Sequence, residues 1–285
     1  MGSGSFSTSS FATYASSLGR TYNKDTGRVT GQTYEARHID DKMKPYKVMR
    51  ECCNTDEHPN TIPVILALDV TGSMGKACTE TAAALGTIMS DLYTKFEDVQ
   101  IMVMGIGDMA YDSAPIQISQ FESDVRIAEW LDKVWLEFGG GGNSYESYTA
   151  AWYMGLYHTK LDAYDKQGRK GIIITMGDEP LNPYLPKTGI ERCVGDNVQG
   201  DVETGDLYVE ACKKFDIYHI AVDDIRSSYS RYKNGIKDTF GSFLGERLKV
   251  STINGLGGAI CDCIEDSVNG GSMPNTTTNN DGISW

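Results

Sequence analysis

Continuous apolar runs predict a sheet whose strands are buried on both faces. Runs of this kind, without alternation of polar and apolar residues, are typical of parallel strands that helices cover on each side. Two shorter stretches predict an edge strand at residues 115–119 and a short strand near residue 250. The four longer runs are Thr61–Leu68, Val99–Ile106, Gly171–Thr175 and Ile217–Val222.

Helical segments separate these runs. Apolar residues at helical spacing predict helices at residues 73–93, 125–135, 145–161, 207–214, 229–248 and 258–268. Strands that alternate with helices predict an α/β fold: a Rossmann-like, doubly wound, mostly parallel sheet with helices on both faces and right-handed crossovers. We assign this domain to residues 61–268.

The two ends of the chain lack this pattern. Residues 1–60 are predicted to be an N-terminal arm, extended or partly disordered, because the first 35 are rich in Ser, Thr, Gly and Tyr. Residues 36–60 are polar and are expected to lie along the surface of the domain. Residues 269–285, rich in Gly, Asn and Thr, are expected to be a C-terminal tail.

Composition narrows the range of partners and locations. The 285 residues carry a net charge of −13, which disfavours nucleic acids as partners. No apolar stretch is long enough to span a membrane, and the N-terminus has neither the basic nor the apolar part of a secretion signal. The seven cysteines are irregularly spaced, unlike a secreted disulfide framework. We therefore expect a cytoplasmic protein that does not associate with membranes.

Polar side chains gather where the predicted strands end. The stretch V64-I-L-A-L-D-V-T-G-S-M-G75 places Asp69, Thr71 and Ser73 directly after the first strand, and Asp178 follows the third. In open parallel sheets, ligands bind beyond the carboxyl ends of the strands. Carboxylate, hydroxyl and amide oxygens are hard ligands that suit Mg²⁺ or Mn²⁺, whereas zinc would need the histidine or cysteine that is missing here.

The same residues resemble a known motif. D69-x-T71-x-S73 resembles the metal-ion-dependent adhesion site of von Willebrand factor A domains, which usually reads D-x-S-x-S. The glycine-rich G139-G-G-G-N143 resembles the second loop of that site, and T175-M-G-D178-E-P180 resembles the third. The resemblance implies that Asp69, Thr71, Ser73, Asn143 and Asp178 hold Mg²⁺ or Mn²⁺.

Three positions depart from the family pattern. Thr71 replaces a serine and keeps the hydroxyl, whereas Asn143 stands where threonine is usual. The third loop has one extra residue before Asp178, which changes the reach of that carboxylate. Residues 1–60 lie outside the resemblance.

The family resemblance also implies a function. A partner protein would supply an acidic residue to the metal, so that the cation bridges the two proteins. Such domains often work beside AAA+ ATPases or in larger complexes. Two alternatives stay open: a structural or assembly protein with a vestigial site, and a metal-dependent hydrolase or phosphotransferase. The second is disfavoured because no general base, P-loop, D-x-D pair or G-x-S-x-G motif accompanies the site.

Each proposed ligand also has a structural explanation. Ser73 fits a helix N-cap, Asp178 fits a turn, and Asn143 with Glu146 fits a variant capping box. Their joint occurrence at one sheet edge favours the metal site.

Three further features outside the motif are predicted to have no role in binding. Asp108 is expected to be a solvated loop acid. His219 is expected to be a core residue with satisfied hydrogen bonds. The aromatic residues of 145–157 are expected to pack a helix.

Overall fold

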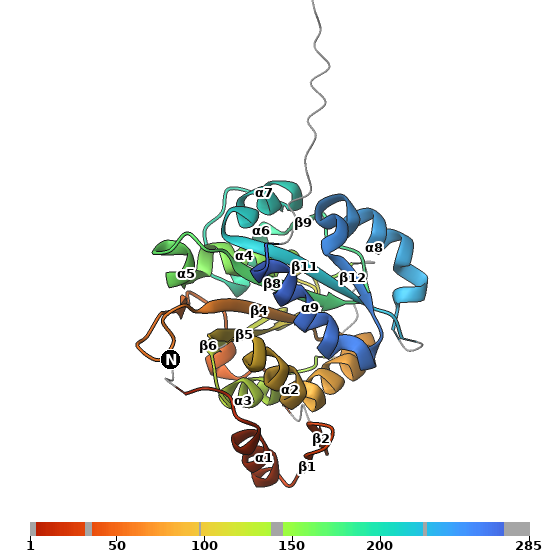
Figure 1. Ribbon diagram of the computed structural model, residues 1–285. Coiled ribbons are helices and arrows are strands. Elements are labelled where there is room, and N and C mark those ends of the chain that lie inside the picture. Colours follow the sequence, from red (N-terminus) through yellow and green to blue (C-terminus); the bar gives the residue numbers. More distant parts are fainter. Residues whose placement is uncertain (1–3, 32–35, 97, 138–144, 225–226, 271–285) are drawn as a thin grey trace, which may run out of the picture.

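A six-stranded sheet forms the centre of the computed structural model, which describes residues 4–31, 36–96, 98–137, 145–224 and 227–270 (Figure 1). Its strands lie in the order β12-β11-β8-β4-β5-β6, and only β6 runs antiparallel to its neighbour. Their bounds are β4 (Ile62–Asp69), β5 (Val99–Ile106), β6 (Ile116–Glu122), β8 (Gly171–Gly177), β11 (Phe215–Val222) and β12 (Leu248–Ser251). This confirms the predicted doubly wound, mostly parallel sheet.

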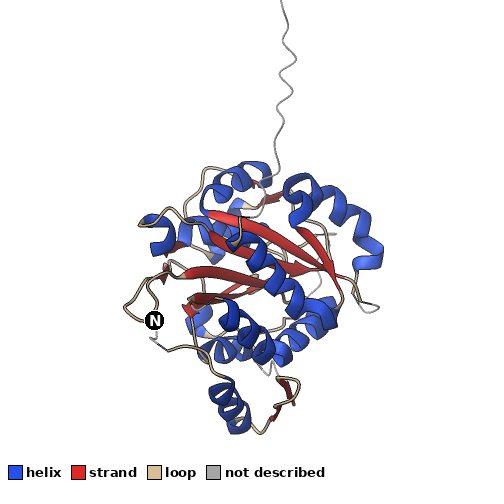
Figure 2. Cartoon of the chain, viewed as in Figure 1, coloured by secondary structure: helices blue, strands red, loops and turns tan. Residues whose placement is uncertain are grey.

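Helices cover both faces of the sheet, and Figure 2 shows the strands between them. Alternate side chains of β4 enter two separate cores: Val64, Leu66 and Leu68 face one layer, and Ile65 and Ala67 face the other. The first layer contains α2 (Gly75–Lys95), α3 (Arg126–Lys133) and α9 (Leu256–Val268); the second contains α4 (Thr149–His158), α7 (Thr204–Lys214) and α8 (Tyr229–Leu244). Burial on both faces explains why β4 reads as a continuous apolar run.

The helix expected at residues 145–161 is shorter in the structure. It ends at His158, and β7 (Thr159–Leu161) pairs in parallel with β3 (Arg50–Cys52). Residues 36–60 therefore add a strand as well as a surface segment. The remaining short elements are a 3₁₀ turn at Asp41–Met43, α5 (Asp162–Asp165), β9 (Tyr184–Leu185), α6 (Lys187–Cys193), β10 (Val202–Glu203) and 3₁₀ turns at Gly245–Arg247 and Ile253–Gly255.

The N-terminal arm is folded, so the expectation of an extended or partly disordered segment is wrong for residues 8–30. This part forms α1 (Thr8–Ser17) and a hairpin of β1 (Thr21–Asn23) and β2 (Arg28–Thr30). Phe11 and Ala15, one helical turn apart, are buried in the core that includes α2.

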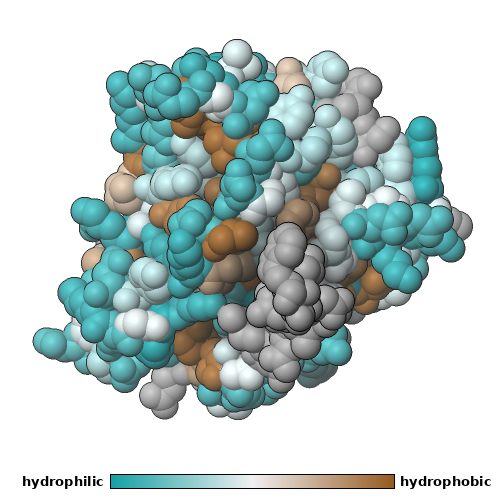
Figure 3. Space-filling model, turned by 90° about the horizontal axis from the view of Figure 1, so that it is seen from above, coloured by the Kyte–Doolittle hydropathy of each residue, from teal (hydrophilic) through white to brown (hydrophobic). Residues whose placement is uncertain are grey.

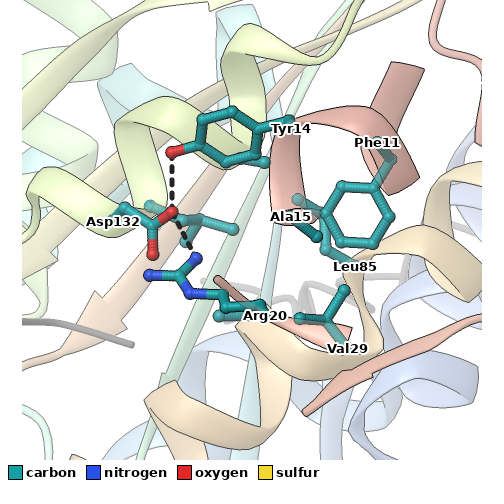
Figure 4. Close-up of a pocket in the computed structure, with 10 residues that line it drawn as sticks. Phe11, Tyr14, Ala15, Arg20, Val29, Leu85 and Asp132 are labelled. Carbon is teal, nitrogen blue, oxygen red and sulfur yellow. Dashed lines mark hydrogen bonds and ion pairs between the residues drawn. The ribbon is translucent and has the colours of Figure 1, made fainter. Parts of the chain in front are cut away.

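A polar link also ties the arm to α3. Figure 4 shows Tyr14 and Arg20 converging on Asp132 of α3. Their donor atoms each lie 2.7 Å from the same carboxylate oxygen of Asp132. The boundaries predicted at residues 60 and 268 stay predictions, and residues 271–285 of the expected tail lie outside the described ranges.

One face of the molecule is largely polar. Figure 3 shows a face on which hydrophilic residues predominate and apolar ones are scattered between them. Among the described residues, no helix combines the length and the apolar character that crossing a membrane requires.

Candidate metal centre

The order of the strands reverses direction at β4. The chain passes from β4 to β5 on one side and later returns to place β8 on the other side of β4. Ligands of doubly wound sheets bind at such a reversal, outside the carboxyl ends of the strands. Asp69 is the last residue of β4, and Asp178 directly follows β8. The two acids therefore lie on neighbouring strand ends, as predicted.

The first loop fixes Asp69 in place. Its carboxylate is fully buried, and its Oδ1 atom accepts hydrogen bonds from the Thr71 backbone amide at 2.9 Å and the Thr71 hydroxyl at 2.6 Å. A 3₁₀ turn at Gly72–Met74 then leads into α2. Ser73 lies inside this turn and makes no cap for α2, whose N-cap position is Met74. The N-cap explanation of Ser73 is therefore wrong.

Ser73 instead connects the first loop to the third. Its hydroxyl donates to Asp178 Oδ1 at 3.0 Å, and Asp178 Oδ2 accepts from the Ser228 amide at 2.5 Å. The extra residue in the third loop therefore does not keep Asp178 from the site. The structure brings Asp69, Thr71, Ser73 and Asp178 together, whereas Asn143 lies outside the described residues.

Tyr148 is a part of this site that the sequence did not reveal. Its ring is fully buried, and its hydroxyl donates to Asp69 Oδ2 at 2.7 Å. The Tyr148 hydroxyl oxygen also accepts a hydrogen bond from the Glu179 amide at 3.4 Å. The expected role of this aromatic residue, helix packing, is therefore incomplete.

Gly177, the last residue of β8, makes room for that tyrosine. A Cβ atom at Gly177 would lie 1.9 Å from the Tyr148 hydroxyl oxygen. Any side chain at position 177 would thus collide with Tyr148. The glycine directly before Asp178 is the signal in the sequence that could have indicated a bulky neighbour at this point.

Two more acids near the site are buried. Glu146 is 3% exposed and Asp108 is 2% exposed, so the expectation that Asp108 is solvated is wrong. Asp108 Oδ1 accepts from the Ala110 amide at 2.8 Å. Glu146 Oε2 and Asp108 Oδ2 have no hydrogen-bond partner in the described part of the chain. Burial, followed by the charge of Asp69, raises the pKa of Glu146 far above its usual range.

Burial also dominates the electrostatics of the two central acids. It raises the pKa of Asp69, and the neighbouring Asp178 raises it further, while hydrogen bonds from Thr71 and Tyr148 oppose the shift. Burial raises the pKa of Asp178 as well. For Glu179, burial and then the charge of Asp178 raise the pKa to about 7. Ionised, these carboxylates repel one another, and a bound cation would stabilise them.

His219 supports the site from the core. It is fully buried, which lowers its pKa to about 3 and keeps it neutral. Its Nδ1 atom lies 2.8 Å from the Thr175 hydroxyl, and its ring stacks on Phe240 and meets the edge of Tyr148. The core position is confirmed, but only one ring nitrogen is satisfied, because Nε2 has no partner among the described residues.

The donor set fits a hard cation. Within the described ranges, no three His, Cys, Asp or Glu side chains come together as a metal site. A cation at this site would therefore be held by two carboxylates together with neutral oxygens, and Thr71 and Ser73 supply hydroxyl oxygens. Within the described residues, the carboxylates of Asp69 and Asp178 accept hydrogen bonds from hydroxyls and backbone amides. Such an oxygen set suits Mg²⁺ or Mn²⁺.

These pKa shifts predict how metal-free protein responds to pH. Asp69, Asp178 and Glu179 hold their protons to higher pH in the folded than in the unfolded protein. Their contribution to stability is therefore complete below about pH 4 and is lost as pH rises through the folded values, about 7 for Glu179. We expect the melting temperature of metal-free protein to fall between pH 6 and pH 8. Mg²⁺ should raise it more at pH 8, because the cation binds ionised carboxylates.

Differential scanning calorimetry with and without Mg²⁺ measures both effects. Asp69→Asn removes one of the titrating groups and should show a shallower dependence on pH. A metal-free melting temperature that stays constant or rises between pH 6 and pH 8 would contradict the prediction.

The fold resembles that of several solved structures. No protein-family model matches the chain, and no curated protein matches it in sequence. The pilus adhesin SpaC from Lactobacillus rhamnosus GG, in its open conformation, has a TM-score of 0.50 and 10% identity, over 87% of this chain and 36% of SpaC. The chain thus spans about a third of the length of that adhesin.

Two isolated domains are also similar. The vWF domain of the type V pili tip protein Mfa5 from Porphyromonas gingivalis has a TM-score of 0.41 and 12% identity, over 76% of this chain and 98% of the domain. The SpRpn10 VWA domain has a TM-score of 0.41 and 9% identity, over 75% of this chain and 98% of that domain. The similarity to SpaC concerns the fold alone. The TM-scores of the Mfa5 and SpRpn10 domains are lower, and we draw no conclusion from them. The strand order itself defines a doubly wound, mostly parallel sheet.

Proposed function

We propose that the protein is a divalent-cation-dependent protein–protein interaction module. Asp69, Thr71, Ser73 and Asp178, with Asn143 as a fifth ligand, would hold Mg²⁺ or Mn²⁺, some of them through water. The observation that carries the proposal is the hydrogen bond of 3.0 Å from Ser73 to Asp178, which joins the first and third loops beside the buried Asp69.

The charge of the donor set supports a role in binding a partner. Asp69 and Asp178 each also accept hydrogen bonds from hydroxyl or amide donors, which weakens their carboxylates as ligands of a cation. Thr71 and Ser73 contribute no negative charge. A cation held in this way keeps affinity for one more carboxylate. An Asp or Glu side chain of a partner protein is the ligand that this arrangement favours.

One observation keeps a second candidate open. Glu179 has a pKa of about 7, which suits a general base at neutral pH, and its backbone amide is already part of the site. A metal-dependent hydrolase would use such a group. Hydrolysis of p-nitrophenyl phosphate by the Mn²⁺-loaded protein, abolished in Glu179→Gln, would favour the enzyme over the binding module.

Calorimetric titration of metal-stripped protein with Mg²⁺ and Mn²⁺ tests the site. We expect one saturable site in the parent, and affinity lower by more than about 100-fold in Asp69→Ala and Ser73→Ala. Ser242→Ala removes an exposed serine hydroxyl on α8, away from the site, and should bind as the parent does. A folded parent that binds neither metal, or an Asp69→Ala variant that binds both normally, would overturn the proposal.

Partner binding can be tested without knowing the partner. Water-proton relaxation of the Mn²⁺-loaded protein reports water on the metal. Acetyl-Gly-Glu-Gly-amide should displace that water and lower the relaxation enhancement, whereas acetyl-Gly-Gln-Gly-amide should not. Equal responses to the two peptides would exclude carboxylate recognition by the metal.

A further inference from the structure

Three tyrosines lie beside the candidate metal centre, on segments that leave the same edge of the sheet. Tyr111 is in the loop after β5, Tyr145 precedes α4, and Tyr184 is the first residue of β9. Tyr111 is 59% exposed, Tyr184 is 38% exposed, and Tyr145 is partly buried. We call these three residues the tyrosine rim.

Hydrogen bonds hold the three segments together. The Met109 amide donates to the Ser147 hydroxyl at 2.9 Å, which joins the loop after β5 to the segment before α4. The Asn182 side chain accepts from the Thr149 amide at 3.2 Å and donates to the Tyr184 carbonyl at 2.9 Å. The start of α4 is thereby joined to the segment that carries β9.

The rings of the tyrosine rim also lie within electrostatic reach of one another and of the site. Burial raises the pKa of Tyr145, and three groups raise it further: Tyr184, Asp108 and Tyr111. Tyr145 directly precedes Glu146, whose pKa is raised by burial and then by the charge of Asp69. The tyrosine rim is therefore one surface next to the proposed metal ligands.

Acidic side chains dominate the charge at this edge. Those that gather there are Asp69, Asp108, Asp112, Glu146, Asp178 and Glu179. Two arginines lie near them but are engaged within the protein: Arg192 donates to two backbone carbonyls, and Arg231 stacks on Tyr232. A partner that brings a carboxylate to the metal would be repelled by these acids. A positive charge beside that carboxylate would offset the repulsion.

Tyrosine rings provide a second reason to expect a cation. An aromatic face attracts a positive charge, and this chain already pairs Lys47 with Tyr46 at 5.4 Å and Arg231 with Tyr232 at 5.0 Å. In the part of the chain that the structure describes, no basic side chain covers a ring of the tyrosine rim. Arginine suits such a surface best, because its planar guanidinium stacks on aromatic faces and stays charged.

We propose that the tyrosine rim binds an arginine of the partner protein, close in sequence to the acid with which that partner reaches the metal. The inference rests on the proposed function and narrows the class of partner. The recognised segment would carry both charges, the acid for the cation and the arginine for the rings.

The test uses two peptides and the Mn²⁺-loaded protein. Acetyl-Arg-Gly-Glu-Gly-Arg-amide places an arginine on each side of the acid, so it can present one in either direction along the site. The second peptide has citrulline in place of both arginines, which keeps the shape and removes the charge. Water-proton relaxation gives the concentration of each peptide that displaces water from the metal. We expect the arginine peptide to act at a concentration lower by about 5-fold or more.

Variants of the exposed rings separate the tyrosine rim from the general negative charge. Tyr111→Leu and Tyr184→Leu keep apolar bulk but remove the aromatic face, and each should reduce the preference for the arginine peptide by about 2- to 5-fold. Tyr111→Phe and Tyr184→Phe keep the ring and should keep the preference. Tyr157→Leu is the matched control, at a tyrosine that is 50% exposed and lies about 13 Å along α4 from Tyr148.

The outcomes distinguish this inference from the proposed function. A parent that binds no Mn²⁺, or whose metal-bound water neither peptide displaces, contradicts both. Equal action of the two peptides, or a preference that survives both leucine substitutions, overturns the role of the tyrosine rim and leaves the metal site standing. Equal weakening of both peptides in the leucine variants also overturns it, because the rings would then bind an apolar group. Loss of the preference in the leucine variants alone establishes the role.

Discussion

Replacing Gly177 by alanine should abolish divalent-metal binding and destabilise the fold. The new Cβ atom would lie 1.9 Å from the Tyr148 hydroxyl oxygen and 2.4 Å from the adjacent ring carbon. Because the ring is enclosed by His219 and Phe240, it cannot move aside without disturbing the core. Overpacking of this kind costs about 1–3 kcal/mol and occasionally more. We expect Gly177→Ala to lower the free energy of unfolding by the upper end of this range, because β8 and the loop that carries Asp178 must also shift.

Chemical denaturation gives the change in the free energy of unfolding, and calorimetry gives the loss of metal binding. Gly241→Ala in α8 is the matched control, because its Cβ atom would meet nothing nearer than 4.0 Å. Alanine there should stabilise the helix by about 0.5–1 kcal/mol and leave metal affinity unchanged. Adding Tyr148→Ala to Gly177→Ala should recover part of the stability, since it removes the atoms that collide. Parent-like stability and affinity in Gly177→Ala would refute the prediction.

The apolar pattern of the sequence predicted the buried strands and the sheet edge at which the acids lie. Burial on both faces makes a strand continuously apolar, so β5 was predicted with the bounds that the structure has, Val99–Ile106. The rule that ligands lie at the carboxyl ends of parallel strands placed Asp69 and Asp178 at one edge, because it needs only the order of elements. The helix that was expected to continue to residue 161 stopped at His158, since pairing with β3 is a long-range event.

The contacts that complete the site could not be predicted in the same way. Tyr148 reaches Asp69 across 79 positions of the chain, and an aromatic residue at a helix start usually indicates packing. The burial of Asp108 and Glu146 likewise depends on how separate loops close over one another. Only Gly177 gave a local sign of these contacts, because a residue without a side chain leaves room for a bulky neighbour.

The arm was misjudged for a different reason. Its Ser- and Thr-rich composition suggested disorder, and it outweighed the spacing of Phe11 and Ala15, which are four residues apart on one helical face. A few apolar side chains suffice here, namely Phe6, Phe11, Ala15 and Val29, because the surface that receives them already exists on the domain. Composition describes what a segment can bury by itself, not what it can bury against a preformed neighbour.

Phe11→Ala should lower the free energy of unfolding by about 3 kcal/mol, at the lower end of the cost of such a truncation. Phe11 is 3% exposed, and its ring centroid lies 5.7 Å from that of Phe6 and 5.8 Å from that of Tyr22. It also contacts α2 at Gly86, where a Cβ atom would lie 2.7 Å from its ring. The arm can detach locally, which limits the cost to the free energy of its docking.

Metal affinity should stay unchanged in Phe11→Ala, because Gly86 lies about 16 Å along α2 from its first residue, Gly75. Thr13→Ala, at an exposed position of α1, controls for changes in the helix itself and should unfold as the parent does. Denaturation and metal titration of the same samples measure both properties. Equal stability of the two variants would mean that the arm contributes nothing to the fold. Loss of metal binding in folded Phe11→Ala would mean that the arm shapes the site.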